Sequence, residues 1–442
     1  MQINRLTLTN FRAFEQAEFE FQPGMNLLVG INGVGKSTVL DAIRIMLSQL
    51  LPIVGVSKSK RLDFDVKDIT VECDWLYTSL VCNIAGVSLE YESRRWREKN
   101  IKHSSEPIEN DDGNLPELKR LREILDKHLP QELKGMKQKD ILKYLKASEQ
   151  QPLALYFSTR RSLANMATPS KQSSAGNQAA AFADALTHRE LRLREFAEWL
   201  LVQKALVKEG VKLAEQHLSV LNNAVTNFID TCTGLEAIRE PTTTLLLNKE
   251  GMKLDIRLFS DGERGILALI LDLARRLSQA NHKLENPLQD GKAIVLIDEL
   301  DLHLHPRWQR TIVEKLTQTF PNCQFIATTH SPQIIGEVHP SGLILLQKED
   351  NRVVVIQEGL QSFGLDSSWI LKHLMETEPR NKTVQAQINS IEDSLEEGDL
   401  ELARNQLDTL KRMIGSDDET SRFEASINNL EALADEVDSE EE

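Results

Sequence analysis

Cysteine is scarce in this sequence, and long hydrophobic runs are absent from it. The 4 cysteines lie far apart with no CxxC pair, which argues against a zinc site and against a disulfide framework. No apolar run reaches the roughly 18 residues that a membrane helix needs, and the first residues lack the basic and then apolar order of a signal peptide. We therefore expect a cytoplasmic protein with reduced thiols and no membrane partner.

A surplus of basic residues is also missing, because the formal net charge is −15. The charge is unevenly placed. Residues 381–442 carry 18 acidic and 5 basic side chains, whereas residues 1–380 carry 49 acidic and 47 basic ones. The acidity belongs to the C-terminal tail, so direct DNA binding by the nearly neutral main body stays open.

The clearest motif that is present is the segment GINGVGKS at residues 30–37, which matches the phosphate-loop pattern G-x-x-x-x-G-K-[ST]. An apolar run at 26–29 precedes it, and residues 38–47 have helical periodicity, as expected of a strand, a loop and a helix. In such loops backbone N–H groups surround the phosphates, the Lys36 ammonium meets the β and γ oxygens, and the Ser37 hydroxyl ligates Mg²⁺. A glycine-rich turn without a ligand is the weaker alternative. The motif predicts binding of a nucleoside triphosphate.

Two further apolar strands end in chemically active side chains. Residues 293–297 lead into Asp298 and Glu299, which we expect to hold Mg²⁺ together with Ser37 and to polarise the attacking water, respectively. Residues 324–328 lead into the loop that contains His330. Because ligands meet the carboxyl edge of a parallel sheet, we expect His330 to contact the γ-phosphate.

The segment SDGER at residues 260–264 precedes an apolar helix at 266–274. A hydroxyl, backbone N–H groups and the positive end of a helix together offer a second anion site. Taken alone, such a segment is more often an ordinary helix N-cap. Both interpretations stay open on this segment by itself.

The four motifs in this order resemble the ABC-type ATPase heads of the SMC and RecF kind. In that comparison GINGVGKS is the Walker A loop, FSDGER the counterpart of the ABC signature, AIVLIDELD the Walker B strand and ATTHSP the switch-histidine loop. The resemblance covers residues 1–100 and 235–358. It implies that two chains stack head to tail around ATP, with the signature of one chain on the γ-phosphate held by the other. LSGGQ and an evident glutamine loop are lacking, so the residue that senses a partner module stays unassigned.

The resemblance also implies roles for individual residues, with ATP and Mg²⁺ as the cofactors. The expected catalytic residues are Lys36, Glu299 and His330. The expected metal ligands are Ser37 and Asp298. The expected nucleotide contacts are Asn32, Gly33, Gly35, Lys36, Ser37, Thr38, Ser260, Gly262, Glu263 and Asp301. An H-x-H pair at positions 303 and 305 has no third ligand nearby in sequence, so an ordinary structural role is favoured over metal binding.

The compact size and the segment DLHLHP at 301–306 resemble the stand-alone defence ATPases related to OLD proteins, and most closely the PtuA proteins of Septu-type antiphage systems. OLD proteins carry a TOPRIM nuclease after the ATPase, whereas this sequence offers only a hairpin and helices there. The resemblance therefore implies a separate HNH nuclease partner of the PtuB kind. The alternative is a RecF- or SMC-like DNA-repair ATPase that clamps DNA. A scaffold with a vestigial ATPase is disfavoured, because the catalytic residues are intact.

We expect an α/β ABC-ATPase head, with a mixed sheet core that carries the P-loop, an antiparallel β lobe and a helical insertion, followed by a C-terminal helical tail. At 442 residues the chain exceeds one ordinary domain. The predicted parts are an N-terminal ATPase lobe at 1–96, a helical insertion or arm at 97–234 with a core strand at 152–157, a C-terminal ATPase lobe at 235–375 and an acidic tail at 376–442.

Three finer predictions concern local structure. Strand-like residues run from 66 to 76, and a helical piece from 115 to 129. Residues 181–232 have helical periodicity with a break near Gly210. In the tail, apolar residues recur at helical spacing in three segments joined at Gly398 and Gly415. The tail either packs only on its own core or docks a partner nuclease or a neighbouring subunit. The expected partners are therefore a second copy of the chain, as a homodimer or a higher assembly of dimers, and an HNH-type nuclease bound through the C-terminal helices.

Overall fold

The computed structural model describes residues 1–57, 60–97, 121–123, 133, 136–148, 150–159, 163–164, 178–187, 191–239, 243–350 and 352–440. The chain divides into two compact units, Met1–Ile370 and Leu371–Glu442. The four-part division predicted from the sequence stays a prediction. The central sheet, the antiparallel β lobe and the helical tail are those expected of an ABC-type ATPase head with a C-terminal tail.

A six-stranded sheet forms the centre of the first unit, in the order β16-β15-β3-β14-β13-β7. Its strands are β3 (Met25–Val29), β7 (Leu153–Phe157), β13 (Ala293–Ile297), β14 (Gln324–Thr328), β15 (Leu343–Glu349) and β16 (Arg352–Ile356). Neighbouring strands run parallel, except that β16 is antiparallel to β15. Strands β3, β7, β13 and β14 are buried at every position, which explains their nearly continuous aliphatic sequences. Their carboxyl ends share one edge of the sheet.

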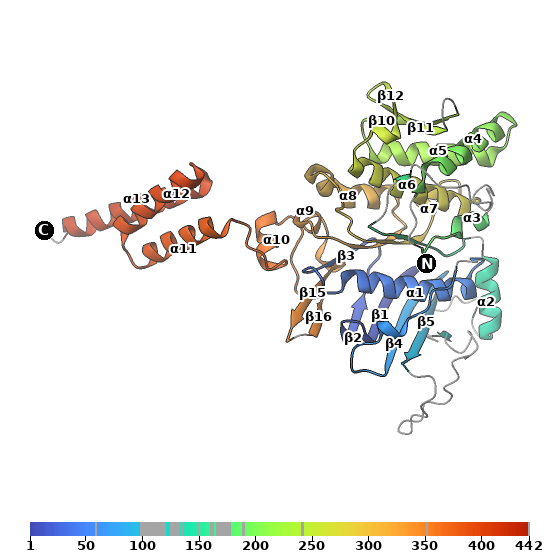
Figure 1. Ribbon diagram of the computed structural model, residues 1–442, viewed down its shortest axis with the longest axis horizontal. Coiled ribbons are helices and arrows are strands. Elements are labelled where there is room, and N and C mark those ends of the chain that lie inside the picture. Colours follow the sequence, from blue (N-terminus) through green and yellow to red (C-terminus); the bar gives the residue numbers. More distant parts are fainter. Residues whose placement is uncertain are drawn as a thin grey trace. The chain divides into compact units, whose positions relative to one another are not determined.

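A five-stranded antiparallel sheet, β2-β1-β4-β5-β6, forms the second layer. Its strands are β1 (Gln2–Phe11), β2 (Phe14–Glu20), β4 (Trp75–Ile84), β5 (Val87–Trp96) and β6 (Leu121–Glu123). Helix α1 (Lys36–Val54) contacts strands of both sheets and contributes to one hydrophobic core with them (Figure 1). By length and composition α1 could cross a membrane, but 72% of its apolar window is buried inside the protein. Its apolar character follows from its place between two sheets.

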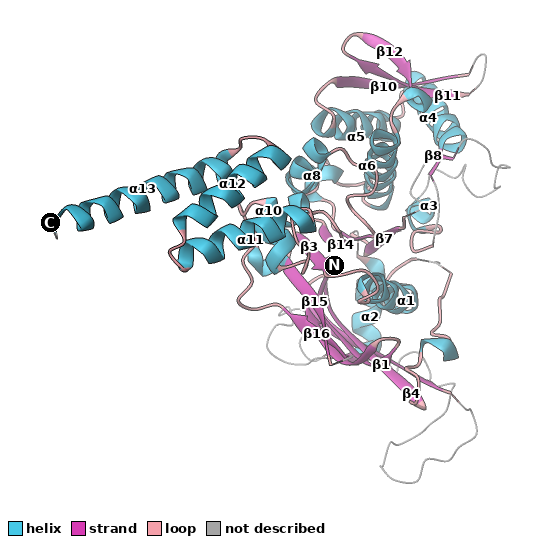
Figure 2. Ribbon diagram, turned by 60° about the vertical axis from the view of Figure 1, so that its left-hand side comes forward, coloured by secondary structure: helices cyan, strands magenta, loops and turns pink. Residues whose placement is uncertain are grey.

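Helices cover the other face of the central sheet (Figures 1 and 2). They are α3 (Gln178–Phe182), α4 (Leu193–Lys208), α5 (Lys212–Phe228), α6 (Asp261–Ala280), α7 (Pro287–Asp290) and α8 (Pro306–Thr319). A small antiparallel sheet of β10 (Cys232–Ile238), β11 (Thr244–Lys249) and β12 (Met252–Asp255) leads into α6. The remaining elements of this unit are α2 (Gln138–Ala147), β8 (Leu163–Ala164), β9 (Leu191–Arg192), α9 (Pro332–Ile335) and the start of α10 (Ser367–His373).

The second unit contains three helices, α11 (Lys382–Glu396), α12 (Leu400–Ile414) and α13 (Asp418–Glu440), as the sequence predicts. Gly398 and Gly415 lie between them with φ of 78° and 84°, a backbone conformation that favours glycine at helix ends. A small core holds the helices together. It comprises Ile388, Ile391, Ala403, Leu407, Leu410 and Ile427.

Three local predictions differ from the structure. Residues 66–68 form a 3₁₀ turn rather than a strand, because the Asp65 side chain and Asp68 form a reciprocal cap there. The helix predicted at 115–129 is wrong at 121–123, which pair with β5 at the edge of the antiparallel sheet; the rest of that segment lies outside the described residues. Residues 181–232 do form helices with a break at Gly210, whose φ is 81°, but β9 and the start of β10 interrupt the helical run.

Candidate nucleotide site

The phosphate loop lies between β3 and α1, where the sequence places it. Gly30 and Gly35 have φ of 147° and 111°, which other residues rarely adopt. A Cβ atom at Gly30 would lie 2.3 Å from the backbone oxygen of Leu346, and one at Gly35 would lie 2.9 Å from the ring of Phe14. Neighbouring elements therefore approach the loop so closely that only glycine fits. Its tip, including Asn32 and Gly33, is exposed to solvent.

Lys36 at the first position of α1 folds back over the loop. Its ammonium donates hydrogen bonds to the carbonyl oxygens of Gly30 at 2.7 Å and Ile31 at 3.0 Å, and the residue is only 6% exposed. Burial lowers the pKa of Lys36 to about 8, although the carboxylates of the site oppose this shift. At neutral pH the ammonium stays mainly charged, and it lies against the carbonyl oxygens of the loop.

Ser37 and Asp298 come together although they are 261 residues apart in the chain. The Ser37 hydroxyl donates a hydrogen bond to Asp298 Oδ1 at 2.9 Å. The same oxygen accepts a second hydrogen bond, at 2.8 Å, from the hydroxyl of Thr328. A hydroxyl and a carboxylate at this separation form an oxygen pair of the type that Mg²⁺ prefers, so the residues fit the predicted metal. Thr38 lies half-buried in the first turn of α1.

Glu299 is held in an unusual backbone conformation at the end of β13. Its φ is 50°, which is uncommon outside glycine. Its backbone N–H donates a 2.7 Å hydrogen bond to the Thr328 hydroxyl, and the next N–H, of Leu300, donates at 2.7 Å to the Thr328 carbonyl oxygen. Thr328 thus contacts both acidic residues that follow β13. Sequence reasoning missed this role, and the only available signal was the polar residue at the end of an apolar strand.

Asp301 connects the loop after β13 with the histidine loop after β14. Its Oδ1 accepts hydrogen bonds from the Thr329 hydroxyl at 2.6 Å and from the backbone N–H of His330 at 3.1 Å. The pKa of His330 is lowered, first by burial and then by the charge of Lys36. The imidazole is therefore neutral at physiological pH, and it can donate one N–H to an anionic ligand.

The SDGER segment forms a complete helix cap at the start of α6. The Ser260 hydroxyl donates to Glu263 Oε2 at 2.9 Å and accepts from the Glu263 N–H at 3.3 Å, while Lys249 on β11 pairs with Glu263 Oε1 at 2.8 Å. A Cβ atom at Gly262 would lie 2.3 Å from the backbone oxygen of His303. The start of α6 therefore packs on the loop that follows β13. In the described part of the chain, no hydrogen bond joins Ser260, Gly262 or Glu263 to the phosphate loop.

The pair of histidines after β13 has a structural place. His305 is the N-cap of α8, and its Nδ1 accepts a 3.2 Å hydrogen bond from the N–H of Arg307. Across the residues that the structure describes, no group of three or more His, Cys, Asp or Glu side chains could hold a metal ion. The helix cap is an ordinary structural role for His305.

The P-loop between β3 and a buried helix, the paired carboxylates after β13 and the histidine after β14 define a P-loop ATPase of the ABC type. The chain belongs to the family described as "AAA domain, putative AbiEii toxin, Type IV TA system", whose profile matches residues 88–336, more than half of its length. A second profile, "P-loop containing region of AAA domain", matches residues 3–50. The predicted relationship to ATPases of the RecF and OLD kind, PtuA included, is confirmed.

Similar proteins span nearly the whole chain. The Retron Ec83 probable ATPase of Escherichia coli is 28% identical, over 95% of this chain and 85% of its own length. The Septu protein PtuA of Bacillus thuringiensis is 26% identical, over 89% of both chains. Among solved structures, the SMC head bound to the C-winged helix domain of ScpA covers 81% of this chain and 99% of its own, with a TM-score of 0.46 and 14% identity.

Proposed function

We propose that this protein binds and hydrolyses ATP, dimerises around it and regulates a separate HNH nuclease in antiphage defence. The observation that carries the ATPase assignment is the contact of Ser37 with Asp298, at 2.9 Å, immediately beside Glu299. This contact links the phosphate loop to the end of β13, where Glu299 follows Asp298 and can act on water. Similarity to the Septu protein PtuA over most of the chain supports the assignment to defence.

Each residue of the site has a chemical task in this proposal. Lys36 exchanges the carbonyl oxygens of the loop for phosphate oxygens, so its charge is already in place when ATP arrives. Ser37 and Asp298 would hold Mg²⁺, which when bound neutralises charge on the β- and γ-phosphates. Glu299 orients the attacking water and accepts its proton, and the neutral His330 donates an N–H to the γ-phosphate.

The dimer follows from the position of the second anion site. Ser260 and Asp261 are exposed at the start of α6, where the N-terminal end of the helix carries partial positive charge. The neighbouring Gly262 packs on the loop after β13 of its own chain, and among the described residues Ser260 hydrogen-bonds to Glu263 and not to the phosphate loop. A second chain can therefore receive this helix end at the γ-phosphate, with Ser260, Gly262 and Glu263 acting in trans.

The nuclease would dock on the C-terminal unit. Several large apolar side chains of α12 and α13 are exposed there although the three helices already have a core. They are Leu402 at 44%, Met413 at 47%, Leu430 at 39% and Leu433 at 57% exposure. Exposed apolar residues set among acidic ones suit a partner with an apolar patch and a basic rim.

The test of the ATPase and the dimer uses Glu299→Gln, which retains nucleotide binding and removes the group that activates water. We expect light scattering to show a doubling of mass when this variant receives ATP and Mg²⁺, and no doubling in Lys36→Ala. Wild-type protein should release phosphate from ATP, while both variants should not. An unchanged mass of Glu299→Gln at saturating ATP would refute the ATP-linked dimer. Binding of duplex DNA by this dimer, weakened steeply by salt, would favour the DNA-clamping alternative.

The test of the docking site uses Leu430→Asp, placed on an exposed position so that the helix still folds. Association with a candidate HNH nuclease should fall at least tenfold in this variant. Asn405→Asp, a change of charge on an exposed position of α12, serves as the matched control. Equal association by both variants and the wild type would exclude this surface.

A further inference from the structure

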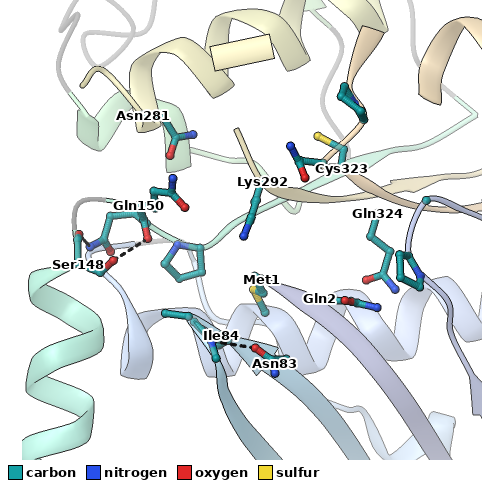
Figure 3. A pocket seen from close by; sticks show the side chains of 18 of the residues that line it. Met1, Gln2, Asn83, Ile84, Ser148, Gln150, Asn281, Lys292, Cys323 and Gln324 are labelled. Carbon is teal, nitrogen blue, oxygen red and sulfur yellow. Dashed lines mark hydrogen bonds between the residues drawn. The ribbon is translucent and has the colours of Figure 1, made fainter. Parts of the chain in front are cut away.

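A cleft of about 730 Å³ lies at the amino-terminal edge of the central sheet, away from the candidate nucleotide site (Figure 3). Four of its lining residues stand directly at the start of buried parallel strands. Gly24 precedes β3, Pro152 precedes β7, Lys292 precedes β13, and Gln324 begins β14. The cleft therefore contacts the amino ends of the strands whose carboxyl ends carry the phosphate loop, the carboxylates and the histidine.

Other elements of the ATPase machinery also end at this cleft. Asn281, which caps the end of α6, lines it, whereas the start of the same helix carries Ser260. The turn between β4 and β5 forms a wall through residues 83–86, and the end of α2 forms another through Ala147 and Ser148. A ligand here would touch the antiparallel sheet, the central sheet and α6 at the same time.

The charge of the cleft favours an anion. Lys292 is the single charged side chain among the described lining residues, and no Asp or Glu lines the cleft with it. It points into the middle of the cleft (Figure 3), and within the described ranges it forms no ion pair or hydrogen bond. Lys292 is exposed, so a ligand in the cleft can reach its ammonium group. An ammonium group in this setting suits a phosphate.

The rest of the lining suits a planar polar group. The ring of Tyr144 on α2 is 43% exposed at the cleft, where a base can stack on it. The side-chain amides of Gln2 and Gln150 face the same space (Figure 3), and amides can donate to and accept from a base or a sugar. The volume of about 730 Å³ is within the range of small-molecule sites, roughly 300–1,000 Å³.

We propose that this cleft is a regulatory site for a nucleoside phosphate, with the phosphate on Lys292 and the base on Tyr144 and the amides. Its occupancy would change ATP turnover, because the ligand bridges the starts of the strands and the end of the helix on which the catalytic residues stand. This second part rests on the proposed ATPase function, whereas binding itself does not. The site is distinct from the phosphate loop.

The binding test uses AMP as the probe, in a Lys36→Ala background. AMP lacks the β- and γ-phosphates that the loop is built to hold, so the background and the probe both silence the ATP site. We expect calorimetry to find one AMP per chain and AMP to raise the Tm by about 2 °C or more. Adding Lys292→Glu should abolish both effects. Adding Lys348→Glu, an exposed lysine on β15 outside the cleft, should preserve them.

The kinetic test compares ATP turnover by otherwise wild-type protein with and without AMP. We expect AMP to change the rate at least twofold, and Lys292→Glu to remove the response. An equal response in both proteins would place AMP at the phosphate loop and overturn the proposal. Absence of AMP binding in the Lys36→Ala background would also overturn the proposal. Equal increases in Tm with AMP and with orthophosphate would overturn it as well. Absence of ATP hydrolysis by the wild-type protein would instead refute the proposed function. The binding test would still decide whether AMP occupies the cleft.

Discussion

Replacing Thr328 by Val should separate folding from catalysis at the candidate site. Valine has nearly the shape of threonine but has no hydroxyl, and Thr328 is only 1% exposed, so the change removes hydrogen bonds and little else. The hydroxyl donates to Asp298 Oδ1 at 2.8 Å and accepts from the N–H of Glu299 at 2.7 Å. Both acidic residues of the site therefore lose a partner in the same substitution.

The size of the effect follows from what stays paired. Asp298 keeps the hydrogen bond from Ser37, so it loses only one of the two hydroxyl donors to its Oδ1. The N–H of Glu299 loses its acceptor, and an unsatisfied group of this kind costs about 1–3 kcal/mol. We expect the free energy of unfolding to fall by about 2–4 kcal/mol in total. Because the backbone of Glu299 is held at a φ of 50°, its carboxylate should also shift, with a loss in kcat of about 10- to 100-fold.

The assay measures phosphate release at saturating ATP, together with unfolding by urea. Thr328→Ser retains the hydroxyl and should keep kcat within about threefold of wild type, whereas loss of the hydroxyl should lower kcat by about 10- to 100-fold. Thr78→Val is the matched control, because Thr78 is fully buried away from the site and donates only to Met46 Sδ at 3.1 Å and the Ser93 carbonyl at 3.4 Å. It should lose some stability and no activity. Wild-type kcat in Thr328→Val would refute the role given to this hydroxyl.

Three further predictions test other contacts. Gly262→Ala should lower the free energy of unfolding by about 1–3 kcal/mol, because the new Cβ would lie 2.3 Å from the His303 carbonyl oxygen. An unchanged urea midpoint would contradict this close packing of α6 on the loop after β13. ATP affinity should be nearly constant up to pH 7 and about tenfold weaker at pH 9, because Lys36 in the nucleotide-free protein has a pKa of about 8 and loses its proton as the pH rises. Calorimetry at pH 7 and pH 9 measures the two affinities. Lys36→Arg should remove the pH dependence. Arg276→Met should lower the free energy of unfolding by about 3 kcal/mol, since it takes one of two arginine partners from Asp272, whose side chain is only 14% exposed. The ion pairs hold the pKa of Asp272 at about 2, so their stabilisation is present above about pH 4 and lost as the pH falls through 2; acid unfolding should therefore begin at higher pH in this variant.

The sequence was sufficient wherever one segment carries its own structural signal. The P-loop and the strands that end at Asp298 and at residue 328 were predictable, because a buried parallel strand reads as a continuous aliphatic run and the phosphate motif defines its own conformation. The three tail helices were predictable for a similar reason. The spacing of their apolar residues indicates the buried faces, and Gly398 and Gly415 indicate where the helices end. In each case the information is local.

The contacts that sequence reasoning missed depend on which strands are neighbours. Thr328 reaches Glu299 only because β14 lies directly beside β13. The order of strands in the sheet differs from their order in the chain, so this contact could not be predicted from the sequence. The pairing of Lys249 with Glu263 likewise needs the hairpin to fold back onto α6. Strand β6 forms at the edge of a sheet that begins about a hundred residues earlier in the chain, where tertiary pairing outweighs local helical propensity.

The position of α1 between two sheets has a consequence for how this protein can diversify. Most side chains of the helix, from Val39 to Val54, are buried against one sheet or the other. A surface helix can accept substitutions on its solvent side, whereas this one has little solvent side to vary. Any change in its residues must be matched by changes in both layers at once. Amino-acid substitutions among relatives should therefore accumulate in the tail and at the edges of the sheets. The helix that begins at Lys36 should change slowly because of its packing, whether or not its residues contact nucleotide.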